Sequence, residues 1–292
     1  MSLPDDRWSA PDGKVLRESA DDRGIVQCWE GVPLVAVAVE SVSKVFYSGS
    51  EAGLVRALQD ISLEVNSGEF VSILGPSGCG KSTLLSIIAG LAAPTRGVVR
   101  VGGRVVDKPQ TDLGLVFQDA LLLDWRDAIG NVMMQVEAKK LDRSTYQAVA
   151  MELLESVGLK GFENKHPWEL SGGMRQRVSI CRALIHDPPM LLMDEPFGPL
   201  DALTREQLML DLHNLWLERR KTVIFVTHSI NEAVFLSDRV VVMTPRPGEI
   251  FEVLEIDMDH PRDLSAQSSE TFTRTSARIH KMFQSMGIFA KG

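Results

Sequence analysis

The sequence predicts an α/β fold, and two observations carry this prediction. Short apolar runs are each followed by polar or glycine-rich residues, which is typical of buried strands that end at a ligand-binding edge of a sheet. These runs cover 70–74, 113–117, 190–193 and 223–226. The stretch from about 119 to 187 is mostly helical in its spacing, so we expect an inserted helical subdomain.

The N-terminal part changes from irregular to strand-like. Residues 1–33 are rich in Asp, Arg, Ser and Pro and lack periodicity, so we expect a flexible extension. From residue 34 the chain is β-prone, and the alternation over 61–65 favours a half-buried strand. A turn at 66–69 and a hairpin over 98–106, reversing at a Gly-Gly pair, complete this part.

Helical patterns follow. Ser144 is the expected N-cap of a helix that ends near Gly158, and a second helix is expected from 172 to about 185, stopped by Asp-Pro-Pro at 187–189. The segment 204–220 is amphipathic, which predicts a helix with one face on the core. Its apolar stripe consists of Leu208, Leu212, Leu215 and Trp216.

These patterns divide the chain into an N-terminal extension, a main domain and a C-terminal extension. The three parts are 1–33, 34–245 and 246–292. The last is expected to hold a short strand at 250–256 and a helix near 275–286.

Composition narrows the function. The chain has 292 residues, 44% of them hydrophobic and 24% charged, as in ordinary soluble globular proteins. A net charge of −8 argues against nucleic acid as the main partner. No segment has the roughly 20 apolar residues of a membrane span, and the three cysteines match no metal or CxxC spacing, so we expect free thiols.

A glycine-rich loop lies between the strand at 70–74 and a helix that begins at Lys81, where a phosphate-binding loop is expected. The loop fits GxxxxGK[ST]: its glycines let the backbone wrap phosphates, its lysine contributes charge and its serine can ligate Mg²⁺. The residues are Gly75, Pro76, Ser77, Gly78, Cys79, Gly80, Lys81 and Ser82, with Thr83 next in the helix. Cys79 is expected to be no more than a small loop residue.

Three further strand ends carry polar residues. Asp194 closes an apolar strand and can hold Mg²⁺, and Glu195 beside it can orient or deprotonate a water that attacks a γ-phosphate. His228 follows the apolar run at 223–226 and can donate a hydrogen bond to that phosphate. Gln118 follows the run at 113–117, and its amide can touch Mg²⁺ or the water. We therefore expect these residues at one edge of the sheet.

A second anion site is predicted in the segment LSGGMRQRV. Ser171, Gly172 and Gly173 open a helix, where unsatisfied N–H groups and the helix dipole favour negative charge. One nucleotide does not account for two such sites in one chain.

Together these motifs resemble the nucleotide-binding subunit of ABC transporters over about residues 35–245. The resemblance implies a RecA-like P-loop NTPase core with an antiparallel β subdomain and an inserted α-helical subdomain. It identifies LSGGMRQRV as the family signature, placed between the Walker A loop and the Walker B strand. It further implies that Ser171, Gly172 and Gly173 bind the γ-phosphate of an ATP held by a second copy, in a head-to-tail dimer that closes on ATP.

The same resemblance assigns Gln118 to the Q-loop, Asp201 to the D-loop and His228 to the switch position. Phe46 is the expected aromatic that stacks on adenine, with Tyr47 as second choice. The chain departs from the family at Pro199 in the D-loop, where a small residue is usual and where proline would stiffen contacts across the dimer. It also departs at Cys181, where alanine is common.

Weaker signals indicate a subgroup. The stretch 121–126 after the Q-loop and the segment 245–250 resemble importer subunits for nitrate, taurine and aliphatic sulfonates. The resemblance implies that the stretch after the Q-loop receives a helix of the permease. Trp125 in that stretch can equally be a plain core residue.

The expected function is ATP hydrolysis for a bacterial ABC importer of a small anionic solute, with ATP and Mg²⁺ as cofactors. In the expected reaction Glu195 is the base, while Lys81 and His228 stabilise charge. The alternatives are a non-transport ABC ATPase of DNA repair or translation, a nucleotide-gated scaffold without turnover, and an export subunit. The single cassette and the acidic balance argue against the non-transport ATPase. The intact Glu195 and His228 argue against the scaffold, and the lack of a fused membrane part argues against the export subunit.

The expected partners are a second ATPase subunit in a homodimer, a transmembrane permease and, indirectly, a periplasmic or lipid-anchored solute-binding protein. Nucleic acid is not expected. The resemblance places the protein peripherally on the cytoplasmic face of the inner membrane.

Overall fold

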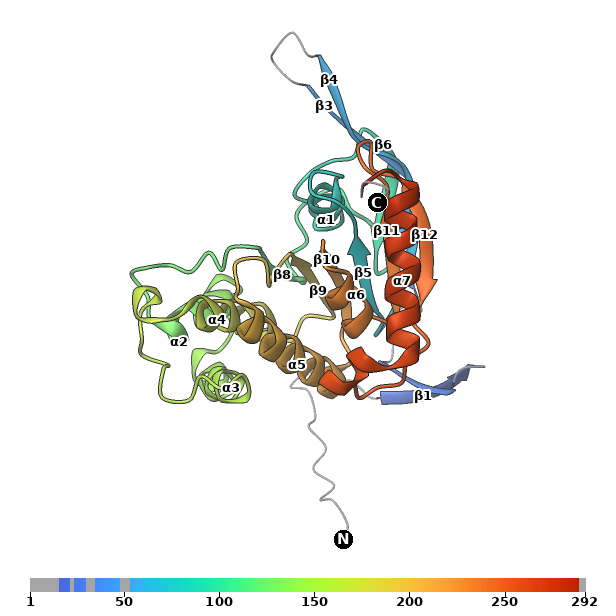
Figure 1. The fold of residues 1–292 in the computed structure, drawn as a ribbon. Coiled ribbons are helices and arrows are strands. Elements are labelled where there is room, and N and C mark those ends of the chain that lie inside the picture. The colour runs from blue at the N-terminus through green and yellow to red at the C-terminus, as the bar shows by residue number, and fades with distance from the viewer. Residues whose placement is uncertain (1–15, 22–23, 30–34, 48–52, 289–292) are drawn as a thin grey trace.

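The computed structural model describes residues 16–21, 24–29, 35–47 and 53–288 (Figure 1). Much of the predicted N-terminal extension therefore lies outside the described residues. Within it, β1 (Leu16–Asp21) and β2 (Gly24–Trp29) pair as an antiparallel hairpin, which the composition of this segment did not indicate.

The central sheet has six strands in the order β12-β11-β5-β10-β9-β8. All pair in parallel except β12, which is antiparallel to β11. The strands are β5 (Phe70–Leu74), β8 (Gly114–Val116), β9 (Met190–Asp194), β10 (Thr222–Thr227), β11 (Arg239–Met243) and β12 (Ile250–Glu255). The apolar runs of the sequence thus form buried parallel strands, as predicted.

A second, antiparallel sheet has the order β4-β3-β6-β7. Its strands are β3 (Val35–Tyr47), β4 (Leu54–Asn66), β6 (Arg96–Val101) and β7 (Arg104–Val105). The hairpin predicted over 98–106 is confirmed, because β6 and β7 pair on either side of Gly102 and Gly103.

The helices are α1 (Lys81–Ile88), α2 (Ala128–Ala138), α3 (Arg143–Ser156), α4 (Gly172–Leu184), α5 (Ala202–Arg219), α6 (Ile230–Leu236) and α7 (Glu270–Ser285). Short 3₁₀ turns lie at Pro167–Glu169 and Leu264–Ser268. Figure 1 shows α2, α3 and α4 grouped on one side of the molecule, away from α1 and α7. No helix in the described ranges is both long and apolar enough to cross a bilayer.

One predicted helix start is wrong. Ser144 lies inside α3, and the N-cap is Asp142, whose carboxylate accepts hydrogen bonds from the N–H of Thr145 at 2.8 Å and the hydroxyl of Ser144 at 2.7 Å. A carboxylate accepts from several donors at once, so the earlier acidic residue takes the cap. The stripe on α5 is buried as predicted.

The core has two layers, one on each face of the central sheet, and β5 shows the division. Phe70 and Leu74 belong to the layer beneath the helices α2 to α7, whereas Val71 and Ile73 belong to the layer beneath α1 and the antiparallel sheet. This is the pleat of a strand that is buried on both faces.

The C-terminal segment is joined firmly to the core. Its strand β12 completes the central sheet, and α7 packs on α6. Buried Arg262 closes the end of α6 through hydrogen bonds from Nη1 to the carbonyl oxygens of Val234 at 3.2 Å, Phe235 at 2.9 Å and Ser237 at 3.0 Å. A cation at a helix C-terminus is also favoured by the helix dipole.

Candidate functional site

Polar side chains from neighbouring strands meet at the carboxyl edge of the central sheet. Lys81 opens α1 beyond the loop that follows β5, His228 follows β10, and Asp194 ends β9. Gln118 follows β8. Because these four strands are adjacent and parallel, the predicted residues come to one edge.

The loop from Gly75 to Gly80 is closely packed and depends on glycine. Gly78 and Gly80 have φ values of 76° and 107°, which glycine adopts without the steric cost of a side chain. A Cβ atom on Gly80 would lie 2.7 Å from the carbonyl oxygen of Ala57 in β4. The N-cap of α1 is Gly80, which has no side chain to cap the helix, and N–H groups at a helix N-terminus favour an anion.

Lys81 is held within this loop. Its side chain is 3% exposed, and Nζ donates hydrogen bonds to the carbonyl oxygens of Gly75 at 2.9 Å and Pro76 at 3.1 Å. An ammonium group has three donors, and the same Nζ lies 3.5 Å from Oε1 of Glu195. The charge therefore faces the region between the loop and the end of β9.

Ser82 and Asp194 form the second contact across the site. The Ser82 hydroxyl donates a hydrogen bond to Oδ1 of Asp194 at 2.9 Å. Burial raises the pKa of Asp194, the Ser82 hydrogen bond opposes this, and the charge of Glu195 adds to the rise. A hydroxyl and a carboxylate in contact are a suitable oxygen pair for a small divalent cation.

Glu195 stands between two basic groups. Its Oε2 lies 2.9 Å from Nδ1 of His228, and its other oxygen faces Lys81. The backbone of Glu195 has φ 44°, a left-handed conformation that is uncommon without glycine, and its N–H donates to Val226 O at 2.9 Å. This turn directs the carboxylate out of the sheet edge.

His228 occupies a tight junction, because β10 ends at Thr227 and α6 begins at Ile230 under the cap of Ser229. Its side chain is 53% exposed. Gln118 is also exposed, and a Cβ atom on Gly198 would lie 3.2 Å from its Nε2. The amide of Gln118 therefore lies beside the loop that follows Glu195.

Helix α4 holds the segment around Gln118 through two side chains. Gln176 donates from Nε2 to the carbonyl oxygen of Phe117 at 3.1 Å. Arg182 donates from Nη1 to Leu121 O and from Nη2 to Ala120 O, both at 2.7 Å. Sequence reasoning did not identify these contacts, because they join residues about 60 positions apart.

The signature residues lie at the start of α4. Ser171 is the N-cap, and its hydroxyl accepts the N–H of Met174 at 3.2 Å. Ser171 and Gly172 are exposed, whereas Gly173 is buried against α5: a Cβ atom there would lie 2.4 Å from Cγ2 of Thr204. Figure 1 places α4 on the side of the molecule away from α1, so this anion site is separate from the loop at Lys81.

The remaining predicted residues lie at the surface. Asp201 caps α5 by accepting the Thr204 N–H at 3.1 Å, and Pro199 before it is exposed. Phe46 near the end of β3 is 44% exposed, with Nζ of Lys44 4.9 Å from its ring centroid. Tyr47 beside it is more exposed still.

An apolar patch lies near the helical side of the site. We define the docking patch as Leu121, Trp125 and Trp168, all exposed; Trp125 is 75% exposed, which overturns the core alternative for it. Trp168 stacks on His166, whose Nδ1 lies 3.3 Å from Asp124 O. These contacts bring the segment that holds Trp168 beside the segment that holds Trp125.

Cys79 and Cys181 are buried and free, and burial raises the pKa of both thiols, that of Cys181 to about 12. Neither thiol is poised to react.

Sequence reasoning missed Arg246, which contacts the carbonyl of Gly78 in the glycine-rich loop from 168 positions away. In the sequence, the Pro-Arg-Pro-Gly segment around it indicates only a subgroup resemblance.

Comparison with known proteins agrees with this arrangement. Residues 58–198 match the family model described as "ABC transporter". An uncharacterized ABC transporter ATP-binding protein of Methanocaldococcus jannaschii, MJ0412, is 49% identical over 230 residues, covering 78% of this chain and 85% of that protein.

Two further relatives carry names of import subunits. The aliphatic sulfonates import ATP-binding protein SsuB of Bacillus anthracis is 41% identical, covering 87% of this chain and 98% of that protein. The taurine import ATP-binding protein TauB of Jannaschia sp. is 46% identical, covering 74% of this chain and 81% of that protein.

Among solved structures, a dimeric post-hydrolysis state of the ATP-binding cassette MJ0796 bound to ADP and Pi matches with a TM-score of 0.67 and 35% identity. The match covers 76% of this chain and all of the other. The sheet edge with its glycine-rich loop, the second helix N-terminus and these relatives lead to one conclusion: the chain belongs to the ABC transporter family of ATP-binding, ATP-hydrolysing subunits.

Proposed function

We propose that this chain powers an ABC importer for a small anionic solute of the sulfonate, taurine or nitrate type. Relatives named as sulfonate and taurine import subunits support the importer class and do not favour a non-transport ATPase. The observation that carries the ATPase part of the proposal is the meeting of Lys81, Asp194, Glu195 and His228 at one sheet edge. The import part rests on the named relatives.

In the proposed reaction the phosphate loop binds the phosphates of ATP, and Lys81 faces the β- and γ-phosphates. Glu195 accepts a proton from water as the water oxygen attacks the γ-phosphorus in line, and ADP leaves. His228, 2.9 Å from Glu195, holds that carboxylate and donates to the γ-phosphate. Phe46, with Tyr47 as alternative, stacks on adenine.

Mg²⁺ fits the oxygen donors of this site. Ser82 and Asp194 would hold it, with Gln118 as a further ligand. When bound, it would neutralise charge on the β- and γ-phosphates.

The second anion site belongs, in this proposal, to the nucleotide of a second copy. Ser171, Gly172 and Gly173 complete the site on the partner subunit, Asp201 lies at the same interface, and the assembly is a homodimer with two shared sites. The dimeric solved relative supports this arrangement.

Mixing two inactive variants tests the shared site. Lys81→Ala removes the lysine and Ser171→Arg blocks the signature, so each alone should lack ATPase activity. In a mixed dimer one site keeps both intact halves, so an equimolar mixture should recover about one quarter of wild-type activity. No recovery would place the whole site within one chain.

We further propose that the docking patch of Leu121, Trp125 and Trp168 receives a cytoplasmic helix of the permease, which places the protein at the cytoplasmic face of the membrane. Three exposed apolar side chains, two of them in the stretch that follows Gln118, support this. In proteoliposomes that contain the permease, Trp125→Ala should lose stimulation by the solute-binding protein loaded with taurine, an alkanesulfonate or nitrate. Its basal ATPase activity should persist. Stimulation by none of these solutes in the wild type would contradict the proposed cargo.

A further inference from the structure

The connection between β11 and β12 lies against the outer side of the phosphate loop. We call residues 244–249 the strap. It is closed by hydrogen bonds from Thr244 N to Glu249 O at 2.9 Å and from Glu249 N to the Thr244 hydroxyl at 2.9 Å. Gly248 also exchanges backbone hydrogen bonds with β4, donating to Ala57 O at 3.0 Å and accepting from Gln59 N at 2.9 Å. The strap is therefore fixed independently of any nucleotide.

The strap and the phosphate loop approach each other closely. A Cβ atom on Gly248 would lie 2.0 Å from the carbonyl oxygen of Cys79, a distance that no side chain tolerates. At the other end of the loop, Gly75 lies close to β11, the strand before the strap, because a Cβ atom there would lie 3.2 Å from Cβ of Met243. The loop thus has a rigid backing along its outer side.

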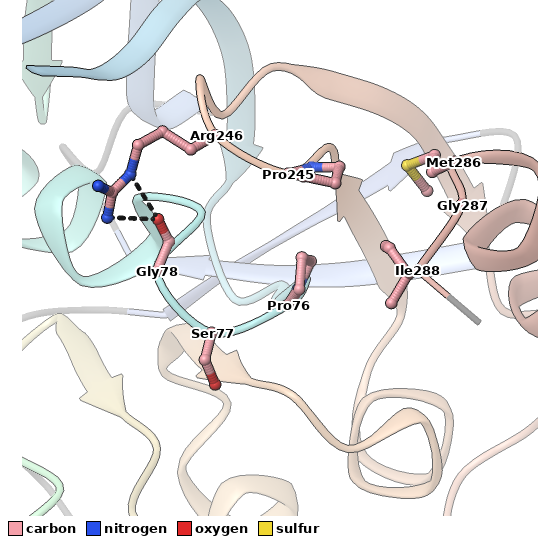
Figure 2. A pocket seen from close by; sticks show the side chains of 8 residues that line it. All are labelled: Pro76, Ser77, Gly78, Pro245, Arg246, Met286, Gly287 and Ile288. Atoms are coloured by element: carbon pink, nitrogen blue, oxygen red, sulfur yellow. Dashed lines mark hydrogen bonds between the residues drawn. The ribbon is translucent and has the colours of Figure 1, made fainter. Parts of the chain in front are cut away.

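Arg246 is the one charged side chain of the strap that reaches the loop in the described part of the chain. Its Nε and Nη2 donate hydrogen bonds to the carbonyl oxygen of Gly78 at 3.2 Å and 3.1 Å, as Figure 2 shows. Arg246 also lines a hollow of about 410 Å³ whose opposite side is formed by Met286 and Ile288. Arg246 is otherwise exposed, so this contact is its principal constraint.

The Gly78 carbonyl is the group whose direction matters. A phosphate cradle needs N–H groups turned inward and carbonyl oxygens turned outward, because a carbonyl oxygen repels a phosphate. Gly78 has φ 76°, and a glycine there can rotate with little steric cost. Two donors in a planar fork hold the oxygen outward, and the positive charge favours an anion nearby.

We propose that Arg246 is a positioning residue for ATP binding, which acts by fixing the Gly78 peptide of the phosphate loop. It prepares the loop before the nucleotide arrives and takes no part in the attack of water. The proposal rests on ATP binding by this family and not on the transported solute.

The expected effect is therefore on affinity and not on turnover. Arg246→Ala should raise both the Kd for ATP and the KM by about fivefold, the loss of about one net hydrogen bond, with kcat changed by less than about twofold. Arg246→Lys keeps a charge and a donor and should give an intermediate Kd. Arg274→Ala, which removes an exposed arginine of α7, is the matched control and should bind ATP as the wild type does.

The measurement is a titration of each purified full-length chain with a fluorescent ATP analogue, together with steady-state ATPase kinetics and a thermal unfolding curve without nucleotide. Arg246→Ala should unfold within about 2 °C of the wild type, because the side chain is exposed. A wild-type Kd and KM in Arg246→Ala would overturn the proposal. A fall in kcat at unchanged KM would overturn it too, since it would assign Arg246 to the chemical step.

Discussion

The carboxylate of Glu195 is engaged on both sides. One oxygen lies 3.5 Å from the Lys81 ammonium and the other 2.9 Å from Nδ1 of His228. In the proposed reaction the same two groups also face the γ-phosphate, so the Glu195 carboxylate and that phosphate share both basic partners.

Replacing that carboxylate should separate binding from hydrolysis. Glu195→Gln keeps the size of the side chain and removes the proton acceptor, so phosphate release should fall by about 10²- to 10⁴-fold while ATP binding persists. Glu206→Gln, an exposed position on α5, is the control and should hydrolyse normally. Brisk turnover by Glu195→Gln in a phosphate-release assay would reject the proposed base.

A buried histidine in α5 should make stability depend on pH. Nε2 of His213 accepts the Arg262 N–H at 2.9 Å. Burial lowers the pKa of His213 to about 4, with His260, Arg262 and Arg220 adding to the effect and Asp238 opposing it. The unfolded chain therefore binds more protons between about pH 6.5 and 4, so the free energy of unfolding rises with pH across this window.

His213→Gln keeps an acceptor for the Arg262 N–H and removes the titration. The slope of its free energy of unfolding against pH should be smaller over that window, because about one proton fewer per molecule is taken up on unfolding. Urea unfolding from pH 4.5 to 7 measures this slope, with His280→Gln on α7 as an exposed control. A slope equal to that of the wild type would show that His213 does not titrate there.

At the scale of elements, α4 and α5 approach each other closely at Gly173. A Cβ atom there would lie 2.4 Å from Cγ2 of Thr204, so Gly173→Ala should push the start of α4 away from α5 and reduce ATPase activity by at least about tenfold. Thr204→Ser removes that methyl group, and the double variant should regain most of the activity. Equal losses in the single and double variants would mean that the contact is not the cause.

Local pattern predicted most elements, and long-range contacts account for the failures. The strand 70–74, the hairpin at 98–106 and the helix from 172 follow from a short apolar run, paired glycines and helix start and stop signals, all of which act over a few residues. Whether Trp125 is buried depends on what packs above it, and Arg246 reaches Gly78 from another strand connection. The motifs located the candidate site, whereas the contacts that support it were visible only in three dimensions.

At the scale of the whole molecule, the two anion sites of one chain lie apart, so we expect assembly to depend on ATP. Glu195→Gln with ATP and Mg²⁺ should elute at about twice the monomer mass of 32.2 kDa and return to that mass when ATP is removed. Adding Ser171→Arg should abolish the shift, because arginine fills the space of the partner's phosphate. Light scattering coupled to gel filtration measures both masses, and an ATP-independent dimer would contradict this expectation.

Helix α4 connects the predicted second anion site with the segment around Gln118. Its first residues carry the signature, while Gln176 and Arg182 further along hold the backbone at Phe117, Ala120 and Leu121. If the signature binds the partner's ATP, each subunit's permease contact is governed by the nucleotide of the opposite subunit. Each half of the permease would then be controlled by the nucleotide of the opposite ATPase subunit. Loss of nucleotide from one site would release the contact between the permease and the opposite subunit. The permease contact of the subunit that held that nucleotide would stay in place.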